Sequence, residues 1–170
     1  MSGLEKVKKE IENAEIAFGK KQGVTKLIAV SKTKPMDQIK KVMDKGQVHF
    51  GENRVQEALS KWEVLKSNRR DLKIHLLGPL QTNKVKKVFS IFDYIHSLDR
   101  LSLAEKLSRE TQERGYCPKI FVQVNTGKEE QKSGVFPENL NKFINSSRKT
   151  YDLDVVGLMC IPPLNEKPEK

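Results

Sequence analysis

Apolar segments of strand length recur along this chain at regular spacing. Successive segments start 21, 25, 21, 25 and 36 residues apart, and they begin near Leu27, Val48, Lys73, Tyr94, Lys119 and Val155. Between them lie segments with the apolar periodicity of helices, such as Val55, Ala58, Leu59 and Trp62. Several strand segments are almost continuously apolar, as in a parallel sheet that is buried on both faces. The alternation therefore predicts an α/β fold built of βα units with right-handed crossovers.

Two parallel architectures compete for this pattern, an open doubly wound sheet and a (β/α) barrel. The first expected strand and turn, LIAVSKTKP (27–35), contain no glycine, whereas a dinucleotide-binding sheet carries GxGxxG there. Polar residues instead follow strand after strand: Ser31 and Lys32, Glu52 and Asn53, Ser97 and Asp99, and Gln123 and Asn125. A barrel gathers such strand ends around one mouth, so the pattern favours a TIM-type barrel.

The strand count predicts an incomplete barrel. Six strands are expected, about six of the eight βα units of a closed barrel, and the chain ends in the proline- and charge-rich PPLNEKPEK (162–170). We expect one domain, 1–170, that lacks the C-terminal strands and begins with an amphipathic helix over 3–22, ended by Gly23. Two open sheet edges would favour self-association.

Composition narrows the expected partners and compartment. The net charge of +10 arises from 32 basic and 22 acidic residues, and it could indicate a nucleic-acid partner. However, the lysines are scattered among glutamates and few aromatics accompany them, which favours a solvated surface and no nucleic-acid partner. Cys117 and Cys160 lie far apart, which argues against a disulfide framework and fits a reducing cytosol. No apolar run approaches membrane-spanning length, so we expect a cytoplasmic protein without membrane contact.

Lys32 is the first candidate for chemistry. On a strand it shares a face with Val30 and Ile28, so in a barrel it would project into the top of the interior. Desolvation there would favour the neutral amine, which is the form that adds to an aldehyde. Lys34 lies beyond the strand, just before Pro35, and is expected in solvent. The alternative is that both lysines only mark the end of the strand.

Two further candidates lie at later strand ends. Asn53 follows Gly51 and Glu52 and offers an amide to a ligand, although an ordinary turn with an Asx cap would look the same. Lys132 and Ser133 belong to the charged loop 125–134, which would overhang the barrel mouth and could reach an anion, or could simply be solvated. The three histidines, His49, His75 and His96, look like isolated core residues. No metal-binding, Ser-His-Asp or P-loop pattern is present.

Six segments together resemble the pyridoxal phosphate homeostasis proteins, single-domain relatives of the alanine racemase barrel. They are AVSKTKP (29–35), FGENRVQEA (50–58), HLLGPLQTNK (75–84), HSLDR (96–100), KSG (132–134) and GLMCIPP (157–163). Any one of them alone would be weak, but they occur in family order and span most of the chain.

The resemblance implies a (β/α) barrel of the alanine racemase N-terminal type that holds pyridoxal 5'-phosphate (PLP) as a Schiff base on Lys32. Asn53 then corresponds to the asparagine of the GEN segment, and Lys132 to a basic loop residue at the cofactor end. The family is thought to buffer PLP in intracellular vitamin B6 homeostasis and to pass it to PLP-dependent apoenzymes, without established turnover, and full-length members are expected to be monomers. A racemase-like enzyme is the alternative.

The resemblance also implies a departure at the C-terminus. Full members continue with a Ser-rich GMS segment and an Arg-Ile-Gly segment, which help to hold the phosphate and the pyridine ring, and neither occurs here. The chain is thus expected to be a truncated member with weakened cofactor binding, and a cofactor-deficient fragment is the further alternative.

Overall fold

The computed structural model describes residues 3–163, which form one parallel sheet with helices between its strands. The strands are β1 Ala29–Val30, β2 His49–Glu52, β3 Lys73–Leu76, β4 Tyr94–Leu98, β5 Lys119–Gln123 and β6 Val155–Met159. The helices are α1 Gly3–Ala17, α2 Met36–Met43, α3 Val55–Asn68, α4 Val85–Val88, α5 Leu101–Arg114 and α6 Leu140–Lys149. Short 3-10 turns, η1 Thr82–Lys84 and η2 Pro137–Asn139, precede α4 and α6. No helix in this part of the chain is long and apolar enough to cross a membrane.

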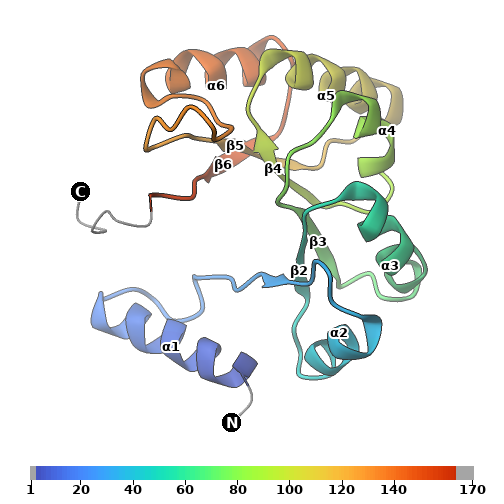
Figure 1. Ribbon diagram of the computed structural model, residues 1–170, viewed down its shortest axis with the longest axis vertical. Coiled ribbons are helices and arrows are strands. Elements are labelled where there is room, and N and C mark those ends of the chain that lie inside the picture. The colour runs from blue at the N-terminus through green and yellow to red at the C-terminus, as the bar shows by residue number, and fades with distance from the viewer. Residues whose placement is uncertain (1–2, 164–170) are drawn as a thin grey trace.

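Strands that are consecutive in the chain pair with each other in parallel, so β1 and β6 are the two edges of this sheet. The sheet order is β1-β2-β3-β4-β5-β6, without the reversal of strand order that defines a doubly wound sheet. The strands form a curved arc, with α2 to α6 along its outer side and α1 on the open side (Figure 1). The predicted six-stranded, barrel-type arrangement is confirmed.

The hydrophobic core lies between the sheet and the outer helices. Phe50 pairs in register with Ile74 across β2 and β3, and Ile95 pairs with Leu76 of β3 and with Ile120 of β5. All five side chains are almost fully buried. On the helix side, Trp62 of α3 packs against Phe50, with ring centroids 4.9 Å apart. Burial of these side chains on one face is the main force that holds each βα unit to the next.

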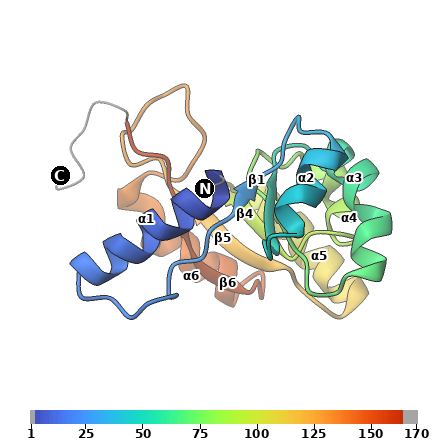
Figure 2. The ribbon, with the colours of Figure 1, turned by 90° about the horizontal axis from the view of Figure 1, so that it is seen from below.

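The first helix differs from its prediction. Helix α1 ends at Ala17, well before Gly23, and its apolar stripe remains largely in solvent, with Phe18 80% exposed. Figure 2 shows α1 set apart from the layer of α2 to α5. Glu15 ties α1 to the segment that follows it, because its carboxylate accepts hydrogen bonds from the Thr25 and Gly23 backbone N–H groups at 2.6 and 2.7 Å. These donors lower the pKa of Glu15. Glu5 of α1 also pairs with Lys45 at 3.0 Å.

The inner face of the sheet carries a chain of three hydrogen-bonded imidazoles. His49 Nδ1 lies 2.9 Å from His75 Nε2, and His75 Nδ1 lies 2.9 Å from His96 Nε2. The ring of Tyr94 stacks on His75 and that of Phe121 on His96, with centroids 4.3 and 4.4 Å apart. The interpretation of these histidines as isolated is therefore wrong, because neighbouring parallel strands bring them together. Within residues 3–163 no cluster of His, Cys, Asp or Glu could hold a metal ion.

Burial keeps this chain of imidazoles neutral. Desolvation lowers the pKa of His75 to about 3, with a further contribution from His96 and His49, and it lowers that of His96 to about 4. In the unfolded chain both groups would titrate near their ordinary pKa of about 6.5. The unfolded state therefore binds more protons than the folded state below that pH.

We expect the stability of the protein to fall as the pH drops below about 6.5, by about 1.4 kcal/mol per pH unit for each of the two histidines. Carboxylates of the unfolded chain remain mostly ionised down to about pH 5. Urea unfolding at several pH values between 7 and 5 isolates the histidine contribution. A His75→Gln, His96→Gln variant should show a much flatter dependence, and equal slopes for the two proteins would contradict the assignment.

Candidate functional site

The loops after β2, β3, β5 and β6 enclose a cavity at the carboxyl ends of the strands. Its volume is about 270 Å³. The lining comprises Asn53, Leu77, Gly78, Pro79, Gln123, Val124, Asn125, Lys132, Ser133, Met159 and Ile161. Two of the three predicted site residues, Asn53 and Lys132, thus lie on one cavity although 79 positions separate them in the sequence.

Lys32 lies at the same end of the sheet but outside that cavity. It occupies a turn directly after β1, and its side chain is exposed. The expectation that Lys32 is desolvated in the interior is therefore wrong for this structure, because β1 is a two-residue edge strand with a strand on one side only. The Lys32 amine makes no hydrogen bond or ion pair with any residue between 3 and 163. Lys34 is exposed, as predicted.

The turns after β2 and β3 meet backbone to backbone at the cavity. A Cβ atom on Gly78 would lie 2.2 Å from the Asn53 carbonyl oxygen, so a side chain at position 78 would force the two turns apart. Gly78 therefore fixes where the Asn53 backbone lies at the mouth.

The loop 125–134 is exposed at most of its positions, but hydrogen bonds within it organise it into a turn. Asn125 is almost fully buried, and its side-chain amide donates to the carbonyl oxygens of Glu129 and Lys132 at 2.8 and 3.1 Å. The Glu129 backbone N–H donates back to Asn125 Oδ1 at 3.1 Å. The Lys132 ammonium lies 2.5 Å from Glu129 Oε1, so this predicted anion ligand is already paired within its own loop.

Sequence reasoning missed the side chains that hold the Lys32 turn. Glu57 and Lys61 of α3 contact the backbone on either side of Lys32, and Glu52 is completely buried beneath the turn. The sequence did contain a signal, because Glu57 and Lys61 stand at i and i+4 on a helix that begins right after the GEN segment.

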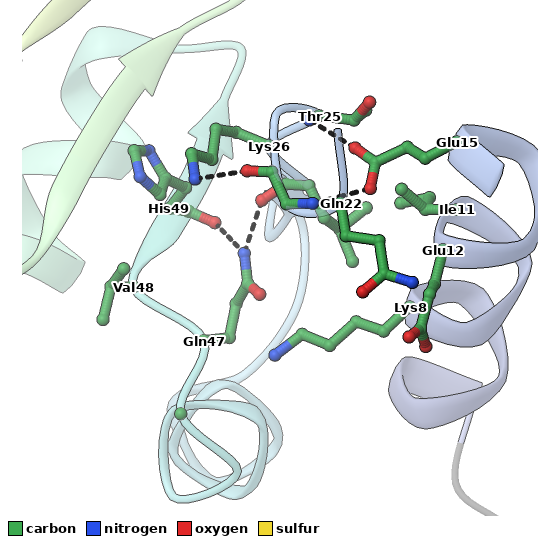
Figure 3. Close-up of a pocket in the computed structure, with 13 residues that line it drawn as sticks. Lys8, Ile11, Glu12, Glu15, Gln22, Thr25, Lys26, Gln47, Val48 and His49 are labelled. Atoms are coloured by element: carbon green, nitrogen blue, oxygen red, sulfur yellow. Dashed lines mark hydrogen bonds between the residues drawn. The ribbon is translucent and has the colours of Figure 1, made fainter. Parts of the chain in front are cut away.

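A second, larger cavity of about 490 Å³ lies at the amino ends of the strands, between α1 and the start of β2 (Figure 3). Several of its polar groups already serve the fold. Gln47 Nε2 donates to the carbonyl oxygens of Leu27 and His49 at 2.7 and 2.8 Å, and Lys26 Nζ donates to that of Gly23 at 2.8 Å. Glu15 is committed to the segment that follows α1. The mouth at the carboxyl ends is therefore the stronger candidate site.

Comparison with known proteins identifies the family of this chain. Residues 4–170 match the family described as alanine racemase, N-terminal domain. The pyridoxal phosphate homeostasis protein of Aquifex aeolicus is 40% identical over 166 residues, which are 98% of this chain and 70% of that protein.

Two solved structures are similar to this chain in fold. The structure of PipY from Synechococcus elongatus PCC7942 with PLP bound is 38% identical, with a TM-score of 0.74 over 92% of this chain and 72% of that one. Alanine racemase of Clostridium difficile shares the fold, with a TM-score of 0.66 at 16% identity over 92% of this chain and 41% of that one. Because a relative that is 40% identical matches 98% of this chain and 70% of its own length, the chain belongs to the pyridoxal phosphate homeostasis protein family.

Proposed function

We propose that this protein binds PLP as a Schiff base on Lys32 and acts in intracellular PLP homeostasis. The proposal rests mainly on the residues that lie at the carboxyl ends of the strands. There a free lysine amine, an asparagine and a loop lysine follow β1, β2 and β5, in a chain 38% identical to a relative solved with PLP bound.

The residues at the mouth fit such a ligand. PLP supplies an aldehyde, which condenses with a primary amine with loss of water, and an aromatic ring that carries polar groups. The exposed Lys32 amine has no partner within the described residues, so it is available for that condensation. Backbone contact between Gly78 and Asn53 leaves the polar groups of Asn53, Gln123 and Ser133 around one cavity beside the same sheet end.

Each residue has a distinct role in this proposal. Lys32 provides the covalent attachment, and the Asn53 amide orients the ligand by a hydrogen bond. Lys132 attracts the negatively charged end of the ligand, and to do so its ammonium must exchange Glu129 for the ligand. Because the Lys132–Glu129 pair is partly exposed, that exchange costs little free energy.

We infer that the protein is a carrier rather than an enzyme. A racemase needs a second group to move a proton at the substrate carbon, and among residues 3–163 no tyrosine or histidine lines the mouth cavity. The histidines of the inner face already hydrogen-bond to one another. PLP-dependent apoenzymes in the cytoplasm are the recipients in this proposal.

Replacing Lys32 by alanine should abolish specific attachment of PLP. Wild-type protein mixed with PLP should develop a visible absorption band distinct from that of free PLP. Borohydride reduction should then fix the pyridoxyl group on the peptide that contains Lys32, as located by mass spectrometry.

Lys34→Ala is the matched control, since Lys34 is exposed and lies two residues away in the same turn region. It should retain the band and the labelled peptide. Equal labelling of the wild-type and Lys32→Ala proteins, spread over many surface lysines, would rule out Lys32 as the attachment site.

Replacing Asn53 by alanine should weaken PLP binding by about 2- to 10-fold, the loss expected for one hydrogen bond. Lys132→Ala should weaken it to a similar extent at low salt and less at high salt, because charge attraction is screened. Fluorescence titration at two salt concentrations measures both effects. An unchanged affinity in either variant would remove that residue from the site.

A further inference from the structure

The turn that carries Lys32 is fixed on both sides by hydrogen bonds to side chains of α3. Before Lys32, the Ser31 carbonyl oxygen accepts a hydrogen bond from Lys61 Nζ at 2.9 Å. After Lys32, the Thr33 backbone N–H donates to Glu57 Oε1 at 2.6 Å. The Lys32 backbone is thus flanked by two anchored residues, while its own side chain stays free.

The ammonium of Lys61 joins these anchors into one network. Besides the Ser31 carbonyl, it donates to Glu57 Oε1 at 2.6 Å and to Glu52 Oε1 at 3.4 Å, so all three of its N–H groups are used. Its side chain is only 15% exposed, that of Glu57 is 26% exposed, and Glu52 is fully buried. Charge-assisted hydrogen bonds among partly buried groups are among the stronger ones in proteins.

The buried carboxylate of Glu52 anchors the network to the sheet. Its Oε1 atom also accepts hydrogen bonds from Ser31 Oγ at 2.7 Å and from Trp62 Nε1 at 3.1 Å. Ser31 is itself buried, and its N–H donates to the Gly51 carbonyl oxygen of β2 at 2.9 Å. The network therefore ties the end of β1 to β2 and α3 together.

The conformation of Thr33 shows that the turn needs such support. Its φ of 60° places a β-branched residue in the left-handed region, where the backbone is strained by about 1–3 kcal/mol. The Thr33 N–H is held in that conformation by the Glu57 carboxylate. Strain that the surroundings enforce at a single turn marks a position where the direction of the backbone matters.

We propose that Lys61 and Glu57 are positioning residues that set the direction in which Lys32 presents its amine to a carbonyl ligand at the mouth of the sheet. This inference rests on the proposed function of Lys32 as the site of PLP attachment. Neither residue contacts the ligand in this proposal. They act by holding Ser31 and Thr33, so that Lys32 meets the ligand from a fixed backbone position.

The same helix offers a matched control. Lys66 of α3 also pairs with a carboxylate, Asp93, at 2.6 Å and donates to a backbone carbonyl, that of Ile91, at 2.6 Å. Its side chain is 22% exposed, close to the 15% of Lys61. Because Asp93 directly precedes β4, Lys66 acts at the amino end of the sheet, away from Lys32.

The test compares Lys61→Met, Glu57→Gln and Lys66→Met with the wild-type protein by two measurements. The first is hydrogen exchange of the Thr33 amide in the protein without PLP. The second is the rate at which PLP becomes attached to Lys32, followed by stopped-flow absorption and by mapping of the borohydride-reduced peptide. Glu57→Gln preserves the shape of the side chain, so it remains informative if Lys61→Met fails to fold.

We expect faster exchange of the Thr33 amide in Lys61→Met and Glu57→Gln, and attachment at Lys32 slowed about tenfold or more in Lys61→Met, as for other misplaced reacting groups. Lys66→Met should match the wild type in both measurements. Unchanged Thr33 exchange, or attachment as fast as in the wild type, would overturn the positioning role. If the wild-type protein attaches no PLP at Lys32, the proposed function fails, and the exchange measurement alone still decides whether the network holds the turn.

Discussion

Parallel pairing of each strand with its neighbours in the chain is the constraint on which the rest of the structure depends. With the order β1 to β6 unbroken, each connecting helix must return along the outer side of the sheet (Figure 1). One face of every strand then packs against helices and becomes apolar, as at Phe50 and Ile95. The carboxyl ends of all strands also come to one mouth, which places Asn53 and Lys132 on the same cavity.

The two faces of the sheet bury different kinds of side chain. The outer face excludes water with large apolar side chains, among them Trp62 and Leu107. The inner face buries polar imidazoles. They are tolerated because the ring nitrogens that face a neighbouring histidine are hydrogen-bonded to it: His49 Nδ1 to His75 Nε2, and His75 Nδ1 to His96 Nε2. The His75 and His96 rings also stack on Tyr94 and Phe121, so this polar layer is packed as well as paired.

At the mouth, hydrogen-bonded segments carry the proposed ligand-binding residues. Glu57 and Lys61 fix the turn around Lys32, and Asn125 organises the loop that carries Lys132. The Lys32 amine itself is exposed and unpaired within the described chain. In the proposed function, this fixed backbone presents a free amine to the ligand from a constant position.

The sequence by itself determined the strands, the helices between them and the parallel barrel-type order, because hydrophobic period and segment spacing are local properties of the chain. It also determined the family, through six short segments in a fixed order. Only the tertiary structure decided which distant side chains meet: the three histidines across β2, β3 and β4, and the Lys61 network beneath Lys32. The tertiary structure likewise decided the exposure of Lys32 and the early end of α1. Both depend on which element packs beside the segment, and sequence periodicity does not identify the neighbouring element.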